Sequence, residues 1–193
     1  DDELDGDGGN DELTGNAGDD TLVGSNGNDT LNGSKGDDWL DAGNGSDSLN
    51  GGTGDDQLDG GAEDDTLIGF DGADSILGGQ GDDSIDGGEG NDVLNGDDGD
   101  DTISGGLGDD SIAGEDGDDK INAGQGADIV SGGNGNDDLL GGGGRDLILG
   151  DGGNDYLNGN GGSDTLAGNE GDDDYSDSEV TAGGQVDDDF LPD

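Results

Sequence analysis

An aspartate recurs at every ninth position along almost the whole chain, and its carboxylate is the group best placed to do chemistry. The column consists of Asp2, Asp11, Asp20, Asp29, Asp38, Asp47, Asp56, Asp65, Asp74, Asp83, Asp92, Asp101, Asp110, Asp119, Asp128, Asp137, Asp146, Asp155, Asp164 and Asp173. Calcium takes about six to eight oxygen ligands from carboxylates and carbonyls. Stacked carboxylates would repel one another strongly without cations between them. We therefore expect cations beside this column, in preference to a solvated charged face or a series of Asx turns.

Other kinds of chemistry find little support in the residue types. The chain has no His and no Cys, which excludes Ser-His-Asp and Cys-His catalysis and removes the soft ligands that zinc and copper favour. Paired carboxylates can serve a glycosidase, but the regular aspartates already have a metal role here. The glycine run at 141–144 lacks the lysine of a phosphate-binding loop. We expect no catalytic residue and no enzymatic activity in this chain.

An apolar column stands two residues after each aspartate and predicts the core. It is aliphatic throughout, except for Tyr175 at its end. Glycine stands four and seven residues before each apolar position, with Glu63, Ala42 and Ala123 as exceptions. Glycine permits positive φ angles and close backbone approach, so tight turns between short strands must position the aspartates. A net charge of −51 with few apolar residues would by itself predict disorder, but a disordered tail has no reason to keep these columns in phase.

Together the columns spell G-G-x-G-x-D-x-U-x, where U is apolar; residues 51–59 (GGTGDDQLD) and 105–113 (GGLGDDSIA) are full copies. This pattern resembles the RTX, or haemolysin-type, calcium-binding nonapeptide repeat, over residues 1 to about 176. The resemblance implies an all-β, right-handed parallel β-roll of about ten 18-residue coils. Each half-coil would have a six-residue turn and a three-residue strand, giving two parallel sheets. Residues 177–193 would be an acidic C-terminal tail that caps the roll in part.

By the same resemblance, the column aspartates are metal ligands through their side chains. The Ca²⁺ ions lie in two rows along the turns, each ion between turns eighteen residues apart. Asp38 and Asp56 would belong to one row, and Asp29 and Asp47 to the other. Backbone carbonyls of the glycine-rich turns would supply most of the remaining ligands, and counting complete turns gives about 17 sites. The residue before each column aspartate is usually Asp or Asn, as at Asp109. Its role is open between an outer-shell or occasional ligand and plain surface.

The acidic balance excludes some partners of the chain and makes cations its natural ones. Nucleic acid and anionic membrane surfaces would repel 54 acidic residues set against 3 basic ones. The longest apolar run, 147–149, is too short to span a membrane. No signal peptide is visible, and the chain starts inside a repeat, so we interpret it as a segment of a larger protein. The resemblance implies bacterial type I secretion, with folding in the calcium-rich medium outside the cell.

The nature of the larger protein stays open. The segment is expected to act as a calcium-dependent scaffold or as a secretion and folding module. The alternatives are the repeat domain of a secreted toxin, protease or lipase and, more remotely, an adhesin or ice-binding roll. The hint of ice binding is a hydroxyl ladder at eighteen-residue spacing, for which ordinary β-propensity is the preferred explanation: Thr30, Ser48, Thr66, Ser84 and Thr102.

Two local irregularities give further expectations. Glu63 and Phe70 replace turn glycines in consecutive repeats, so we expect distorted or empty metal sites around residues 61–74. Near the C-terminal end, Ile129, Leu147 and Leu149 make one outer face apolar. Such a patch on a polar chain indicates docking of the tail, of a downstream domain or of another subunit.

Overall fold

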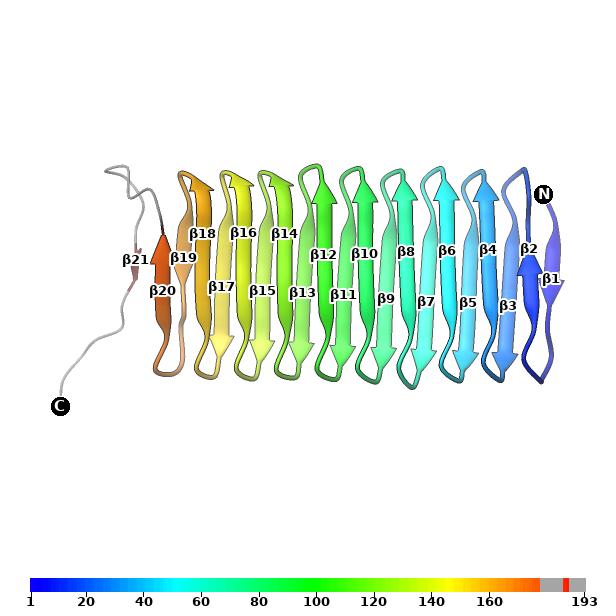
Figure 1. The fold of residues 1–193 in the computed structure, drawn as a ribbon, viewed down its shortest axis with the longest axis horizontal. Coiled ribbons are helices and arrows are strands. Elements are labelled where there is room, and N and C mark those ends of the chain that lie inside the picture. The colour runs from blue at the N-terminus through cyan, green and yellow to red at the C-terminus, as the bar shows by residue number, and fades with distance from the viewer. Residues whose placement is uncertain (178–185, 188–193) are drawn as a thin grey trace.

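A computed structural model describes residues 1–177 and 186–187, and the chain winds through them as a two-layered solenoid of strands (Figure 1). The strands are β1 (Glu3–Asp5), β2 (Glu12–Thr14), β3 (Thr21–Asn26), β4 (Thr30–Lys35), β5 (Trp39–Asn44), β6 (Ser48–Thr53), β7 (Gln57–Ala62), β8 (Thr66–Asp71), β9 (Ser75–Gln80), β10 (Ser84–Glu89), β11 (Val93–Asp98), β12 (Thr102–Leu107), β13 (Ser111–Asp116), β14 (Lys120–Gly126), β15 (Ile129–Asn134), β16 (Asp138–Gly144), β17 (Leu147–Gly152), β18 (Tyr156–Gly162), β19 (Thr165–Ala167), β20 (Asp174–Asp177) and β21 (Val186–Asp187). The described residues form no helix, and so none that could span a membrane.

Two parallel sheets make up the solenoid, as the sequence predicted. The odd-numbered strands form an 11-stranded sheet and the even-numbered strands a 10-stranded one. Strands β1 to β17 each pair with the strand eighteen residues further on, as in the register Leu94↔Ile112. Turns from an odd to an even strand lie along the lower edge in Figure 1, and turns from an even to an odd strand lie along the upper edge. We use these two names throughout.

The core lies between the two sheets and is one large side chain thick in each half-coil. Alternate residues of a strand point to the same face, so each six-residue strand buries two positions. In β11 these are Leu94, which is 1% exposed, and Gly96. The apolar column is therefore the hydrophobic core, and a second inward column is glycine, with Ala42 and Ala123 as its substitutes.

The strands are longer than the three residues expected, because the turn glycines continue the sheet. Most strands have six residues, and the register between β10 and β12 runs on through Gly88↔Gly106 and Glu89↔Leu107. The backbone N–H and C=O groups of these glycines pair with neighbouring coils, which satisfies groups that a looser turn would leave to water. Between β3 and β19 the remaining turns are only two or three residues long, such as 90–92 and 127–128.

Residues that replace the second turn glycine take the left-handed conformation that glycine would have adopted. Asp97 has φ 72° and Phe70 has φ 77°. Glu63, which replaces the other turn glycine, has φ 75°, and its carboxylate accepts a hydrogen bond from the N–H of Gly45 at 2.8 Å. The strand register also passes Phe70 without a shift. The backbone is thus regular at this height, and distorted or empty metal sites around residues 61–74 stay a prediction.

Adjacent glycines at 142 and 143 provide a test of this backbone requirement. Gly142 has φ +99°, and a Cβ there would meet the carbonyl oxygen of Gly124, whereas a Cβ on Gly143 would meet nothing within 4 Å. We expect Gly142→Ala to destabilise the folded roll by about 1–3 kcal/mol, the usual cost of a strained backbone position. Gly143→Ala should leave it nearly unchanged. Denaturant unfolding in calcium, followed by circular dichroism, measures both, and equal losses would contradict the assignment.

Candidate metal centre

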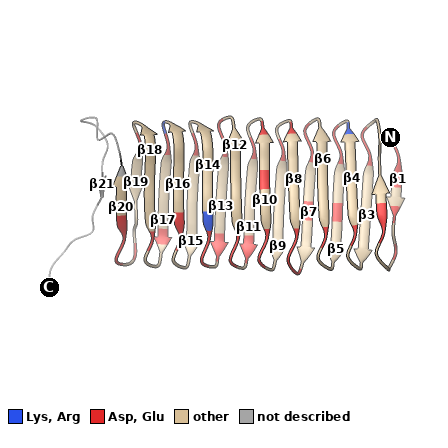
Figure 2. Cartoon of the chain, viewed as in Figure 1, with Lys and Arg blue, Asp and Glu red and all other residues tan. Residues whose placement is uncertain are grey.

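Each column aspartate closes a turn, and its side chain points between the sheets as the apolar residue two places later does. The strand alternation places these two residues on the same inner face. Every column aspartate from Asp20 to Asp164 is at most 4% exposed. Asp11 and Asp173 are partly exposed, and Asp2 is exposed at the end of the roll. Acidic residues consequently gather at the two edges in Figure 2, in line with the turns.

One carboxylate oxygen of each buried aspartate is held by the preceding coil. Oδ1 of Asp74 accepts a hydrogen bond from the N–H of Asp56 at 2.8 Å, and Oδ1 of Asp83 accepts one from Asp65 at 2.8 Å. The same bond recurs along both edges, from the Asp2–Asp20 pair to the Asp155–Asp173 pair. We call this series the inner ladder. It fixes the orientation of every carboxylate in the column.

The second carboxylate oxygen, Oδ2, has no hydrogen-bond partner. This is true of every column aspartate from Asp11 to Asp164, and the atom is buried in each. A buried polar atom without a partner costs on the order of 1–3 kcal/mol, and more when it is charged. Eighteen such atoms in regular rows leave the polar groups of the folded chain incompletely satisfied. The same oxygen is buried and unpartnered at each of these repeats, which makes it a candidate ligand for a cation.

Backbone carbonyl oxygens lie close to the unpartnered Oδ2 atoms. A Cβ built on Gly60 would be 2.6 Å from Oδ2 of Asp65 and 2.6 Å from the carbonyl oxygen of Gly78. A Cβ built on Gly87 would likewise be 2.5 Å from Oδ2 of Asp92 and 2.7 Å from the carbonyl oxygen of Gly105. Glycine leaves room for this convergence, and the small residues Ala42 and Ala123 are the only other ones at this position. Carboxylate and carbonyl oxygens are the donor set that calcium prefers.

Carboxylates alone do not form a metal cluster in the described part of the chain. No group of three or more His, Cys, Asp or Glu side chains is gathered there to hold an ion. Backbone carbonyls must therefore contribute to any metal site that the column builds. This division between side-chain and backbone donors fits the donor set expected from the sequence.

Burial raises the pKa of many column aspartates. The pKa of Asp56, Asp65, Asp101 and Asp137 rises to about 7, chiefly by desolvation and further by neighbouring carboxylates. The backbone N–H of the inner ladder opposes this rise in each case, because it stabilises the charged form. The net effect shows that the charged carboxylate is poorly stabilised by protein groups alone. A cation beside Oδ2 would remove that penalty.

Comparison with known protein families supports the same assignment. The model of the RTX calcium-binding nonapeptide repeat matches overlapping segments that together span residues 1–175. The chain belongs to this RTX family. Members bind calcium through these repeats, and the parallel β-roll is their structural module. No curated protein matched the chain in a search of full sequences.

The RTX pattern located the aspartate column from sequence, but it left the residue before each column aspartate unassigned. In the structure, the Asp and Asn side chains at that place are exposed, and their oxygens accept hydrogen bonds from the next coil. Asp82, for example, accepts from the N–H of Asp100 at 3.0 Å. The sequence contained a clue to this role, because most residues at this place are Asp or Asn, and both carry a side-chain oxygen at Oδ1.

The raised pKa values predict the pH dependence of the calcium-free roll. The folded pKa of Asp56 is about 7, against 3.8 for the ordinary carboxyl group, so protons bind the folded state more tightly. This contribution to stability is complete below pH about 3.8 and is lost as the pH rises through about 7. We expect calcium-free protein to gain β-structure on acidification, measured by circular dichroism.

Protein in saturating calcium serves as the control for this prediction. There the same protons compete with the ions, so acidification should lower the amount of bound calcium. A calcium-free chain whose spectrum is insensitive to pH between 7 and 4 would contradict the electrostatic origin of its instability.

Proposed function

We propose that the chain is a calcium-dependent folding module in which the column aspartates, Asp2 to Asp173, are metal ligands through their side chains. The observation that carries the proposal is the row of buried Oδ2 atoms without a partner along each edge. Bound calcium supplies the positive charge that these oxygens lack. Asp38 and Asp56 belong to the upper-edge row, and Asp29 and Asp47 to the lower-edge row. Pairs of turns eighteen residues apart give about 17 sites.

Folding and calcium binding are coupled in this proposal because neither is favourable alone. The core contributes one large apolar side chain in each half-coil, and the chain carries a charge of −51. In the folded roll the column carboxylates also lose their hydration, which opposes folding. Bound cations offset both the net negative charge of the chain and the lost hydration of the column carboxylates. Low calcium would keep the chain extended, and extracellular calcium would fold it.

A calcium titration tests the coupling. Calcium-free protein at pH 7 should be disordered and should fold cooperatively, with a midpoint at roughly 10⁻⁴–10⁻³ M, as for extracellular calcium modules. Circular dichroism follows the folding, and magnesium at the same ionic strength controls for charge screening. Complete β-structure in excess chelator at pH 7 would reject the proposal.

Substitution of Asp101 tests its role as a ligand. Asp101→Asn keeps the size of the side chain and the Oδ1 acceptor for the N–H of Asp83, but replaces the unpartnered Oδ2 with an amide. We expect about one or two fewer bound ions per chain and weaker folding in calcium, since each turn borders two inter-turn spaces. Without calcium the same change should favour the folded state, because it removes a buried charge.

Asp86→Asn is the matched control for Asp101→Asn. Asp86 lies on the exposed outer face of β10, so this variant removes one negative charge without touching the column. Its calcium stoichiometry, measured by equilibrium dialysis, should equal that of the parent chain. Equal losses in the two variants would show that total charge, rather than coordination, governs the binding.

We further infer a secreted location, by bacterial type I export, and a scaffold or secretion and folding role within a larger protein. Membership of the RTX family supports this inference, and the 1–176 roll is taken as the module. A secreted toxin, protease or lipase bearing this roll is the alternative. An adhesin or ice-binding roll is more remote, although Thr66, Ser84 and Thr102 do share one exposed face in register. The full-length sequence distinguishes these parents.

An interaction surface near the C-terminal end of the roll is a second inference. Ile129 is 52% exposed, and it pairs in register with Leu147, while Ser131 pairs with Leu149. We infer that this patch docks the tail, a downstream domain or another subunit. Most of the tail, residues 178–185 and 188–193, lies outside the described residues, and β21 pairs with β19 at its Val186.

Charge-neutral substitution of the patch tests this inference. Ile129→Ser with Leu147→Ser should reduce any self-association of the folded chain, because it removes exposed apolar area. Val93→Ser, at an equally exposed position on the same outer face, is the control. Sedimentation velocity in calcium measures the effect. A parent chain that is strictly monomeric would exclude another subunit as the occupant.

A further inference from the structure

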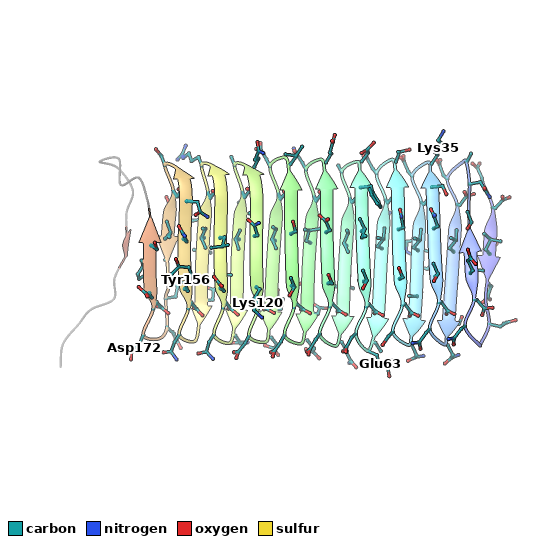
Figure 3. All side chains as sticks on the ribbon, viewed as in Figure 1. Lys35, Glu63, Lys120, Tyr156 and Asp172 are labelled. Carbon is teal, nitrogen blue, oxygen red and sulfur yellow. The ribbon has the colours of Figure 1, made fainter. Side chains whose placement is uncertain are left out.

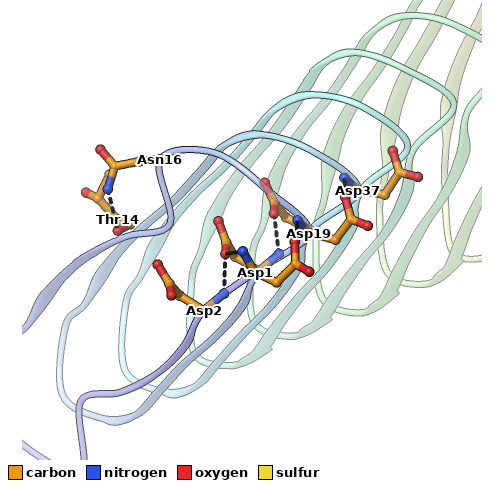
Figure 4. Close-up of polar contacts among 8 residues, drawn as sticks. Asp1, Asp2, Thr14, Asn16, Asp19 and Asp37 are labelled. Carbon is orange, nitrogen blue, oxygen red and sulfur yellow. Dashed lines mark hydrogen bonds and ion pairs between the residues drawn. The ribbon is translucent and has the colours of Figure 1, made fainter.

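The exposed residue before each column aspartate forms a second hydrogen-bond series, which we call the outer ladder. Oδ1 of Asp100 accepts from the N–H of Asp118 at 2.9 Å, and Oδ1 of Asp118 accepts from Asn136 at 2.7 Å. Figure 4 shows the first steps, where Asp19 bonds to Asp1 and Asp37 bonds to Asp19, at 3.1 Å each. Where its side-chain oxygen is present, the outer ladder thus joins a turn to the turn eighteen residues before it.

The two ladders run in opposite directions along the same edge. In the inner ladder, the N–H of one coil donates to a carboxylate of the following coil, as Asp101 does to Asp119 at 2.8 Å. In the outer ladder, the N–H of the following coil donates back to the preceding side chain. The N–H that is held belongs to the residue immediately before the column aspartate. Its fixation therefore sets the backbone from which the proposed calcium ligand projects.

The outer ladder depends on a side-chain oxygen and not on a negative charge. Asn10, Asn91 and Asn136 accept the same bond as the aspartates, at 3.1, 2.9 and 3.1 Å. The Nδ2 of Asn136 and of Asn154 also donates to the side chain before it, at 3.0 and 3.1 Å. Asparagine therefore adds a bond where two stacked aspartates would repel each other.

The outer ladder is continuous over a different half of the roll on each edge. On the lower edge it runs without a gap from Asp64 to Asp172. On the upper edge it runs from Asp1 to Ala73, where alanine offers no oxygen to Asn91. Ala127 interrupts it again before Arg145. Figure 3 places Glu63 and Asp172 on the lower edge and Lys35 on the upper one.

We propose that the outer Asp/Asn column positions the turns: each side-chain oxygen fixes the backbone N–H of the turn eighteen residues later. The gaps at Ala73 and Ala127 are then the places where neighbouring turns of the upper edge separate first. The residues of the outer column act through the backbone of the neighbouring turn, not as calcium ligands. The inference rests on the proposed calcium-coupled folding for its consequence. Its geometry is independent of the identity of the metal.

Four variants test the outer ladder in the full 193-residue chain, folded in saturating calcium. Asp100→Ala and Asp100→Asn both remove one charge, but only Asn keeps the oxygen that accepts from Asp118. Asn136→Ala removes the oxygen without any change of charge. Ala73→Asn adds an oxygen opposite the N–H of Asn91. Amide hydrogen exchange at the turn whose N–H donates the bond and the rate of calcium release into excess chelator are the two measurements.

Asp100→Ala and Asn136→Ala should speed exchange at Asp118 and Asn154 respectively by roughly 2- to 10-fold, the range that the net free energy of one hydrogen bond implies. Calcium release should show a faster phase in both. Asp100→Asn should behave as the parent chain, and Ala73→Asn should slow exchange at Asn91. Fast exchange in Asp100→Asn would assign the effect to charge and overturn the proposal, as would parent-like exchange in both alanine variants.

The parent chain distinguishes failure of this proposal from failure of the proposed function. If the chain does not respond to calcium at all, the calcium-coupled role fails, and exchange in whatever folded state it adopts still tests the ladder. If the chain folds in calcium but the four variants exchange alike, the ladder proposal alone is rejected.

Discussion

A carboxylate that is satisfied at one oxygen and unsatisfied at the other is the constraint on which this structure depends. The inner ladder holds Oδ1 of each column aspartate, and burial isolates Oδ2 from both protein donors and water. Desolvation then raises the pKa of the central aspartates to about 6 or 7, as at Asp74 and Asp101. An ionised carboxylate held in this way opposes folding. A divalent cation with a preference for oxygen, bound beside Oδ2, would offset this cost.

The glycines follow from the same constraint. Glycine five residues before each aspartate leaves the space that the carboxylate and a neighbouring carbonyl share, as Gly60 does for Asp65. Glycine at the following position adopts positive φ and continues the strand, although Asp, Asn, Ser and even Phe70 take the same conformation there. The high glycine content therefore reflects room for oxygen atoms as much as backbone freedom. It also explains the thin core, since glycine is the second inward residue of most strands.

The inner and outer ladders run in opposite directions, so a turn that takes part in both is hydrogen-bonded to the coil before it and to the coil after it. The inner ladder is continuous on both edges, whereas the outer ladder is continuous over the N-terminal half of the upper edge and the C-terminal half of the lower edge. The two outer runs overlap near residues 64–73. This is the height at which Glu63 and Phe70 replace turn glycines. The turn after Phe70 is bonded to the preceding coil, but Ala73 gives it no outer-ladder bond to the following coil.

The sequence alone determined the period, the aspartate and apolar columns and the positions of glycine, because in a solenoid the repeat of the sequence is the repeat of the structure. Through its RTX resemblance it also predicted two parallel sheets. The three-dimensional structure decided what periodicity does not encode. The strands extend through the turn glycines, and each buried column carboxylate has a hydrogen-bonded Oδ1 and an unpartnered Oδ2. The side chains of Asp100 and Asn136 each accept a hydrogen bond from the next coil. These properties arise from contacts between residues eighteen apart, where the orientation of a side-chain oxygen toward a particular N–H depends on how the coils stack.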